Sequence, residues 1–334
     1  MLSNLLIVAI QVLTLFALMG VGAVARKLKW VEDAGIKSIV NILVIVVTPC
    51  LVIDAFQRPF DPAMMKHLGL AFFAVVVIHF IAIALAVLLV RPVGTTPRGV
   101  RANTTGILQV AAAFSNAGFM GLPLEYAILG PEGVFFGVVY VAVFNVFIWS
   151  WGMMRIRGRD SVGPVRDADT LVRENKTSDL IKIIFNPGFV GLALGLPWFL
   201  LSIILPPVIR TPVKMLADLN TPLAMIVIGF YLAGANLKPL FRNRAAYMSA
   251  LTRLIIFPLV IIGGFYPFRT YFNPNMMLAF AIAACAPAAA LTSMMAAKFG
   301  RDVDTAVGIV SGTTLLSMLT MPPMIALAME VLKS

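Results

Sequence analysis

Ten stretches of mostly apolar residues alternate along the chain with short polar segments. Each holds about 20 apolar positions, the length that an α-helix needs to cross the hydrocarbon core of a bilayer. The pattern therefore predicts an all-α integral membrane protein with ten transmembrane helices. The approximate limits of these spans are residues 5–25, 36–56, 67–90, 104–129, 133–154, 181–205, 213–236, 246–268, 275–298 and 304–329.

The composition agrees with this pattern. Hydrophobic residues make up 60% of the 334 residues and charged residues only 12%, about half the charged share of a soluble domain. The excess apolar surface is therefore expected to face a lipid bilayer. No Lys or Arg precedes the first stretch, which is also too long for the core of a signal peptide, so we expect it to be retained as span 1.

The basic residues predict an orientation. The net charge of +11 is spread between the apolar stretches, which favours membrane topology over nucleic-acid binding. Of the 26 Lys and Arg residues, 19 fall in the odd-numbered loops and six in the even-numbered loops and termini. Because cytoplasmic loops carry the excess of Lys and Arg, this split places the odd-numbered loops in the cytoplasm and both termini outside the cell membrane.

The chain divides into two halves of five spans. Residues 155–180 are polar and mixed in charge, and we expect them to form a cytoplasmic linker between residues 1–154 and 181–334. An odd number of spans per half makes the second half insert upside down, as in inverted-repeat transporters. Three landmarks recur in both halves at nearly one offset: Thr48–Pro49 with Thr221–Pro222, Pro123 with Pro287, and Gly130–Glu132 with Gly300–Asp302.

Spans 4 and 9 are predicted to be broken helices. Proline removes a backbone donor and clashes with the preceding turn, so breaks are expected near Pro123 and Pro287. In lipid, irregular backbone is tolerated only where protein buries it or where it lines a watery cavity. The exposed N-termini of half-helices suit an anion. The predicted substrate site comprises Asn116, Asn145, Gly118, Gly121, Leu122, Pro123, Pro287 and Ala288.

The two amides at Asn116 and Asn145 lie in the middle of spans 4 and 5. An amide within the hydrocarbon region faces protein, water or a ligand. Helix–helix hydrogen bonding would explain either residue alone. Their shared neighbourhood beside a broken helix favours contact with a ligand.

Few ionisable side chains lie within the predicted spans. Asp54, Asp218 and His79 have simple explanations, since the acids lie near the outer face and a histidine among apolar residues is expected to be buried and neutral. Glu125, Arg253 and Asp54 are candidates for coupling or gating. Because Arg253 is distant in sequence from the two prolines, we expect an anion to be held mainly by amides and helix ends.

Other chemistry has little support. Cys50 and Cys285 lie in apolar runs without a CxxC partner, and His67 and His79 are the only histidines, so no metal and no cofactor is predicted. Motifs of hydrolases, zinc proteases and nucleotide-binding proteins are missing, which argues against an enzyme.

Several motifs are similar to those of one transporter family. Its most specific motif is Asn116-x-Gly118-x-x-Gly121-Leu122-Pro123-Leu124 followed by Gly130-x-Glu132-Gly133, supported by the Tyr140–Trp149 stretch, Asn186–Pro187, Arg253 with Pro258, and Ala286–Pro287. In these motifs the chain resembles the auxin efflux carrier family, which includes the plant PIN-formed auxin carriers and bacterial malonate and malate permeases. The similarity covers nearly the whole chain.

The resemblance implies a fold and a mechanism. It implies two inverted repeats of five helices, with broken helices 4 and 9 crossing at the centre. Spans 1, 2, 6 and 7 would form a scaffold that makes a homodimer, and spans 3–5 and 8–10 a transport domain that moves like an elevator. A small carboxylate would bind at the crossover, in contact with Asn116 and Asn145. Plant carriers tend to have glutamine at the position of Asn145 and a longer central loop, so neither an auxin-shaped pocket nor control by phosphorylation is implied.

Two alternatives remain open at the level of sequence. One is a sodium-coupled symporter of the bile-acid type with a similar architecture. The other is a membrane receptor or a lipid-modifying enzyme. Sodium dependence would favour the first, whereas binding without flux would favour a receptor.

Overall fold

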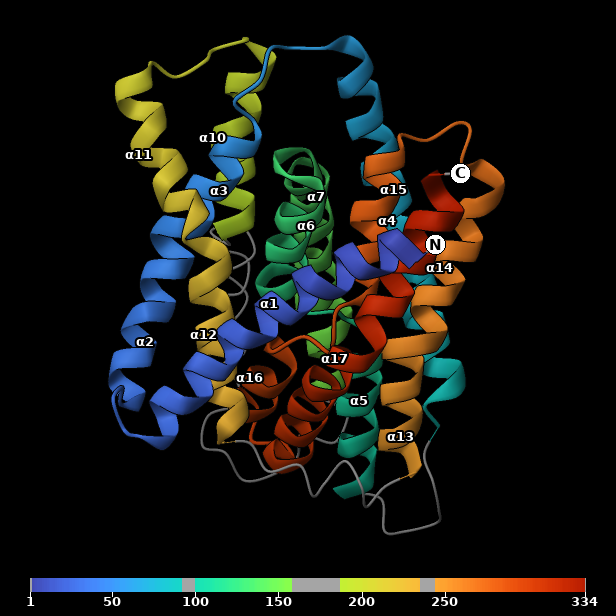
Figure 1. Cartoon of the computed structure of the whole chain (residues 1–334). Coiled ribbons are helices and arrows are strands. Elements are labelled where there is room, and N and C mark those ends of the chain that lie inside the picture. The colour runs from blue at the N-terminus through green and yellow to red at the C-terminus, as the bar shows by residue number, and fades with distance from the viewer. Residues whose placement is uncertain (1, 92–99, 158–186, 235–243, 334) are drawn as a thin grey trace, which may run out of the picture.

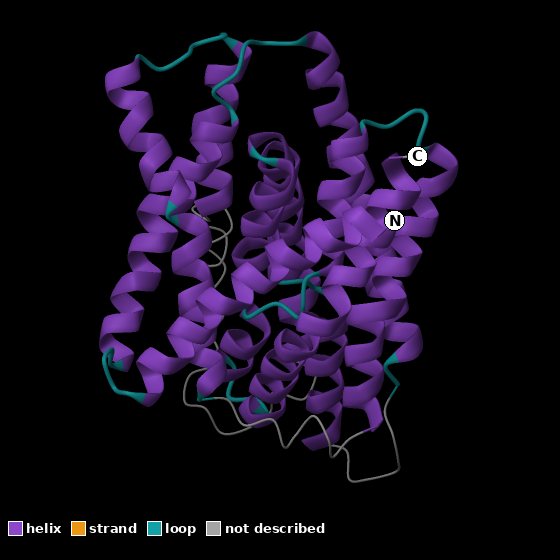
Figure 2. Ribbon diagram, viewed as in Figure 1, coloured by secondary structure: helices purple, strands orange, loops and turns teal. Residues whose placement is uncertain are grey.

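The structure, a computed structural model, describes residues 2–91, 100–157, 187–234 and 244–333, which form helices joined by short connections (Figures 1 and 2). The first half contains α1 (Leu2–Lys27), α2 (Asp33–Ile42), η1 (Leu43–Val47), α3 (Thr48–Ala55), α4 (Pro62–Leu89), α5 (Val100–Ala113), η2 (Ala117–Gly121), α6 (Leu122–Leu129), α7 (Pro131–Phe147), η3 (Ile148–Gly152) and α8 (Met153–Arg157). The second half contains α10 (Pro187–Leu200), α11 (Pro207–Asp218), α12 (Asn220–Ala233), α13 (Arg244–Leu251), η5 (Thr252–Ile256), α14 (Phe257–Phe265), η6 (Tyr266–Phe268), α15 (Pro274–Cys285), α16 (Leu291–Lys298) and α17 (Val303–Lys333).

Within the described residues, seven helical segments are long and apolar enough to cross a membrane. They are Ile10–Lys27, Asp33–Ala55, Met64–Leu89, Pro131–Arg157, Pro207–Ala233, Arg244–Phe268 and Val303–Lys333. Shorter apolar helices cover Thr104–Ala113, Ala117–Leu129 and Pro274–Cys285, which belong to predicted spans 4 and 9. Large apolar side chains point outward, including Leu13, Ile45 and Phe73 at 66%, 70% and 68% exposure. This outer surface requires lipid, and the protein is an all-helical, multi-pass membrane protein.

The predicted start of span 7 differs from the structure. Predicted span 7 begins at residue 213, whereas the helical segment begins at Pro207, because proline at a first helical turn needs no donor. Its first part, α11, is amphipathic and leaves Lys214 about half exposed. Most of the predicted linker, together with the start of predicted span 6, lies outside the described residues.

The sequence predicted a break in span 4 near Pro123, but the structure places the break earlier in the chain. The helix is interrupted at residues 114–116, and Pro123 lies in the first turn of α6, in continuous helix. The preceding π-helical turn, in which the N–H groups of Met120 and Gly121 both donate to the Asn116 carbonyl, shifts the hydrogen-bond register before the proline. The break in span 9 lies at residues 286–290, around Pro287, as predicted.

Close packing of α1 on α12 is made possible by glycine. A Cβ atom on Gly22 would lie 2.0 Å from the Ile226 carbonyl oxygen, and one on Gly229 would lie 1.9 Å from that of Met19. In lipid, small residues let two backbones approach and gain van der Waals contact. The obliquely running α1 also packs on α6 of span 4 and on α17 of span 10, so it joins this pair to both halves of the chain (Figure 1).

Candidate functional site

The two broken helices meet where their backbones are unwound. Ser115 and Ala288 form an antiparallel bridge. The backbone N–H of Asn116 donates to the Pro287 carbonyl at 2.7 Å, and the N–H of Ala289 donates to the Phe114 carbonyl at 2.9 Å. Each break therefore supplies the hydrogen-bond partners that the other loses by leaving the helix, which allows irregular backbone inside a membrane protein.

Side chains from two other helices hold the crossing in place. The N–H of Ala288 donates to Thr313 Oγ1 of α17 at 3.2 Å, while that hydroxyl lies 2.7 Å from the Ile309 carbonyl of its own helix. On the other break, Ser115 Oγ lies 3.5 Å from the Tyr140 hydroxyl of α7. The three side chains are nearly fully buried, so these contacts replace water for polar groups in the core.

Arg253 joins the ends of the two half-helices that lead into the crossing. Its Nη1 donates to the carbonyl of Ala113, the last residue of α5, at 3.1 Å, and its Nη2 donates to the carbonyl of Ala284 near the end of α15. The side chain is fully buried, and its guanidinium carbon lies 4.4 Å from the ring centroid of Phe257. Arg253 is therefore at the crossover, although it is distant in sequence from both breaks.

The opposite helix ends leave donors free. The N–H groups of Ala117, Gly118 and Phe119 in the first turn of η2 receive no acceptor from the described residues, as expected for a helix N-terminus. The Asn116 side chain does not cap this turn and makes no other hydrogen bond within the described part of the chain. A Cβ atom on Gly118 would meet nothing within 4 Å. The same helix start therefore combines free donors with open space at Gly118.

The electrostatics of the crossing favour an anion. Helix C-termini carry about half a negative charge and helix N-termini about half a positive charge. The Arg253 guanidinium offsets the C-terminal ends of α5 and α15, and no carboxylate pairs with it among the described residues. The N-terminal ends of η2 and α16 then remain uncompensated. The expectation that an anion is held mainly by amides and helix ends stays a prediction, and the structure adds a buried positive charge beside them.

Comparison with known proteins identifies the family. A family described as "membrane transport protein" matches residues 7–325, nearly the whole chain. The chain belongs to this family, the auxin efflux carrier family. It is also 27% identical over 227 residues to an "Uncharacterized transporter" of Methanothermobacter thermautotrophicus, covering 67% of this chain and 68% of that protein. The family resemblance drawn from the motifs is confirmed, and the protein is a membrane transporter.

The family motif occupies the crossover and the helix that follows it. Gly121 and Leu122 are buried, and a Cβ atom on Gly121 would lie 3.7 Å from the Ala283 Cα of α15. The Pro123 carbonyl lies 3.5 Å from Thr221 Oγ1 of α12. These residues hold α6 against its neighbours, while Asn116 and Gly118 are the motif residues beside the open space.

The second amide is placed differently from the first. Asn145 is 3% exposed, and its Nδ2 donates to the Val141 carbonyl of its own helix at 2.7 Å. The preceding residue, Phe144, packs edge-on against Phe114, which directly precedes the crossing. The same region of α7 therefore faces the crossover. A role for Asn145 in binding stays a prediction.

Asp54 and Asp218 lie in a contact between helices outside the crossover. Asp54 is buried near the end of α3, where the charges of Lys214 and Arg210 attract it. In the same region Tyr126 of α6 donates to Asp218 Oδ1 of α11 at 2.8 Å, and Lys214 Nζ lies 3.2 Å from the Tyr126 hydroxyl. This exposed network links α6 to α11. Asp54 is thus placed beside a helix–helix contact rather than at the crossover.

Two hydrogen bonds repeat on opposite sides of the crossing. Asn275 Nδ2, in the first turn of α15, donates to Glu132 at the start of α7 at 3.0 Å. Thr104 Oγ1, near the start of α5, donates to Asp302 before α17 at 3.0 Å. The half-helices α6 and α16 are each followed by a positive-φ glycine, Gly130 at 66° and Gly300 at 59°. The two hydrogen bonds and the two glycines thus involve the positions Gly130–Glu132 and Gly300–Asp302, which recur in the two halves of the sequence.

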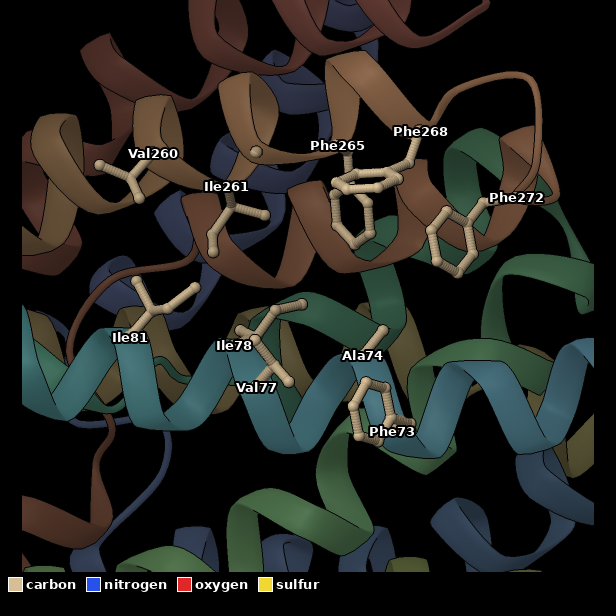
Figure 3. Close-up of a pocket in the computed structure, with 11 residues that line it drawn as sticks. Phe73, Ala74, Val77, Ile78, Ile81, Val260, Ile261, Phe265, Phe268 and Phe272 are labelled. Carbon is tan, nitrogen blue, oxygen red and sulfur yellow. The ribbon is translucent and has the colours of Figure 1, made fainter.

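A groove of about 390 Å³ lies elsewhere, between α4 and α14. Figure 3 shows Phe73 and Ile78 facing Ile261, Phe265 and Phe268 across it. Phe73 and Phe268 are 68% and 51% exposed. The groove belongs to the apolar outer surface, and none of its lining residues lies in either break.

Three residues of the crossing were not singled out from the sequence. Thr313 accepts a hydrogen bond from the N–H of Ala288 in the second break, and Ser115 of the first break contacts the Tyr140 hydroxyl. A detectable signal existed for Thr313, because Thr314 and Ser317 are polar neighbours in an apolar span. The structure also places His79 in an aromatic cluster, with its ring centroid 4.9 Å from Tyr140 and 5.3 Å from Phe147.

Proposed function

We propose that this transporter moves a small organic carboxylate anion across the membrane, with the anion bound at the crossover. The observation that carries the proposal is the charge arrangement there. Arg253 neutralises the two inward C-termini, while the first turn of η2 presents free N–H groups beside Asn116 and an open space at Gly118. Helix N-termini with unsatisfied donors bind anions, and carboxylates are the anions that such ends accept in transporters.

The proposal includes ten spans arranged as two inverted repeats. The recurring hydrogen bonds Asn275–Glu132 and Thr104–Asp302 support it, because each joins the start of one half's broken helix to the other half's next helix. The positive-φ residues Gly130 and Gly300 end corresponding half-helices. A pseudo-twofold axis in the membrane plane would produce this pattern.

We also propose that transport is an elevator movement. Spans 1, 2, 6 and 7 would be the scaffold and spans 3–5 and 8–10 the moving domain. The glycine-mediated packing of α1 on α12 supports a rigid scaffold, and Arg253 binds α5, α15 and its own helix into one unit. The homodimer, formed through the scaffold, and the orientation with both termini outside belong to this proposal. Figure 1 supports loops that alternate between the two membrane faces, since the α1–α2 connection lies at the opposite end of the molecule from the α3–α4 and α10–α11 connections.

The test is binding followed by flux. The purified protein is screened by thermal shift against mono- and dicarboxylates, with amines and neutral sugars of similar size as controls. A carboxylate that raises Tm is then labelled and followed in proteoliposomes, with and without sodium. Carboxylate-specific binding with sodium-independent flux supports the proposal. Binding without flux would indicate a receptor, and strict sodium dependence would indicate a symporter of the bile-acid type.

A further inference from the structure

One carboxyl group is buried in the centre of the bundle without a partner. Glu125 of α6 is 1% exposed, and its Oε2 accepts no hydrogen bond from the described residues. A Cβ atom on Gly137 of α7 would lie only 1.6 Å from Oε2, and one on Gly121 would lie 3.5 Å from Oε1. The carboxyl group therefore occupies a notch that exists because residue 137 is glycine.

The notch contains no compensating charge. Helices α7, α15, α1 and α12 pack on α6. Among the titratable groups of α7 and α15, the Tyr140 hydroxyl interacts electrostatically with both the Glu125 carboxyl and the Cys285 thiol. The titratable residue of α12, Tyr231, lies beside Arg26 and Asp33, which are at the far end of α1 and the start of α2. No charged side chain of the described structure interacts with the Glu125 carboxyl.

The exposed network one residue away does not reach into the notch. Tyr126, Lys214 and Asp218 interact with one another at the surface of α6 and α11. An ionised carboxylate without a partner is costly in an apolar interior, so the packed state holds Glu125 in its neutral, protonated form.

A metal cation is a poor alternative occupant of the notch. Hard cations need several oxygen ligands, and no three acidic, histidine or cysteine residues are grouped anywhere in the described structure. The atoms nearest to the Gly137 position are those of the Glu125 carboxyl and the Leu122 side chain. One carboxylate against an apolar wall is suited to a proton rather than to a sodium ion.

The carboxyl group is also connected to the crossover. Tyr140 lies about one turn beyond Gly137 on α7, and its hydroxyl contacts Ser115 Oγ at 3.5 Å. Tyr140 interacts electrostatically with both Glu125 and Arg253. Tyr140 therefore lies on α7 between the Glu125 carboxyl and the crossover.

We propose that Glu125 is a proton-binding site and that one proton crosses the membrane with each anion. The proposal rests on the proposed function. With the site open to one side, the carboxylate takes a proton from water and forms an O–H bond. The loaded domain then moves with Glu125 neutral. On the other side the O–H bond breaks and the proton returns to water. The empty domain then moves back with Glu125 ionised and hydrated through the vacated anion site, so that the proton is not carried back. A monocarboxylate would thus be carried without net charge.

The experiment follows both substrates of this cycle in one preparation. Proteoliposomes with an enclosed pH dye receive the labelled carboxylate that raised Tm most, and carboxylate uptake and lumenal acidification are recorded together, with and without sodium. For the wild type, acidification should accompany uptake, stop when the carboxylate is omitted, and continue without sodium. Exchange of internal for external carboxylate should be several-fold faster at pH 5.5 than at pH 8.

The variants separate coupling from folding. In Glu125→Gln, which is neutral at every pH, exchange should lose its pH dependence and acidification should disappear. Glu132→Gln changes an acid at the start of α7, outside the notch, and should keep both signals. Glu125→Leu repeats the test if the amide variant does not fold, and the wild-type proton signal is decisive without any variant.

Each contrary result has a distinct meaning. Carboxylate flux without acidification in the wild type overturns the inference but leaves the proposed function standing. Acidification that persists in Glu125→Gln overturns it as well, as does uptake that requires sodium. A wild type that moves no carboxylate overturns the proposed function and this inference together.

Discussion

Arg253 donates a hydrogen bond to the carbonyl of Ala113, and the two residues are 140 positions apart in sequence. The bond places a buried positive charge at the point where α5 stops being a helix. The same guanidinium reaches Ala284 in the other broken span. A single side chain therefore sets the charge of the crossover and links its two halves.

Replacing Arg253 should lower Tm and weaken anion binding as well. In Arg253→Met two buried backbone carbonyls lose a charged donor, at a cost in stability of about 1.5–3 kcal/mol for each hydrogen bond, and the crossover loses its buried positive charge. We expect carboxylate affinity to fall by roughly tenfold or more. Thermal-shift titration measures this, and Arg244→Met, at the start of α13, is the control. Arg253→Lys should recover part of the affinity, and equal affinity in all three variants would contradict the assignment.

Asn116→Ala should reduce carboxylate affinity with little change in Tm. The Asn116 side chain makes no hydrogen bond within the described structure, whereas its backbone N–H holds the Pro287 carbonyl and survives the substitution. Loss of one hydrogen bond from the amide to the charged carboxylate costs about 1.5–3 kcal/mol. Binding and Tm are measured together, with Asn275→Ala as an amide control outside the crossover. Wild-type affinity in Asn116→Ala would exclude the side chain from the site.

Substitution of two glycines, Gly118 and Gly137, should affect thermal stability differently. Gly118 faces open space, so Gly118→Leu should fold with nearly unchanged Tm and block carboxylate binding. At Gly137 the added methyl of Gly137→Ala would collide with the Glu125 carboxyl, and overpacking of this kind costs about 1–3 kcal/mol. Thermal unfolding in detergent measures the difference. A lower Tm for the Gly118 variant than for the Gly137 variant would contradict the packing described here.

Pro123→Ala should have a small effect on both Tm and flux, because Pro123 lies in continuous helix beyond the break. Ala289→Pro, by contrast, removes the N–H that donates to the Phe114 carbonyl. It should abolish flux and lower Tm, since a buried acceptor is left unpaired at a cost of about 1–3 kcal/mol. Parallel flux and Tm measurements test the pair. Loss of flux in Pro123→Ala would restore this proline to the centre of the mechanism.

Tyr126→Phe should change the balance between transport conformations and leave Tm almost unchanged. The hydroxyl joins Asp218 and Lys214 of α11 to α6, but the network is exposed, where ion pairs contribute about 0–1 kcal/mol. Single cysteines are introduced on α6 in a background without Cys50 and Cys285. Their accessibility to a membrane-impermeant thiol reagent reports the balance between the conformations. We expect a shift of up to about fivefold. Lys66→Met, a cation near the start of α4, is the control and should show no shift.

The sequence predicted the membrane class, the helical spans and the family because these depend on local pattern. Runs of apolar residues identify spans through their length alone. The motif around Asn116 and Pro123 pointed to the family that the comparison confirms. The crossover partner Pro287 was also predicted, since a proline within an apolar run marks a break wherever its neighbours lie.

The position of the first break depended on information that no local pattern contains. Proline suggested Pro123, but the helix opens at Ser115, because there its backbone finds hydrogen-bond partners in Ala289 and Pro287. A helix can be interrupted in lipid only where another segment satisfies the freed groups. Which segment that is, and at which residue, is decided by contact across 170 or so positions.

The sequence by itself determined that this is a multi-pass helical membrane protein of the auxin efflux carrier family, with polar and breaking residues in spans 4 and 9. Only the tertiary structure decided which of those residues act together. It brought Arg253 to the ends of α5 and α15, placed Glu125 in the notch at Gly137, and left Asn116 beside free N–H groups. The physical reason is that charge compensation and hydrogen-bond satisfaction in lipid depend on neighbours in space, whereas the propensity to span a bilayer depends on neighbours in sequence.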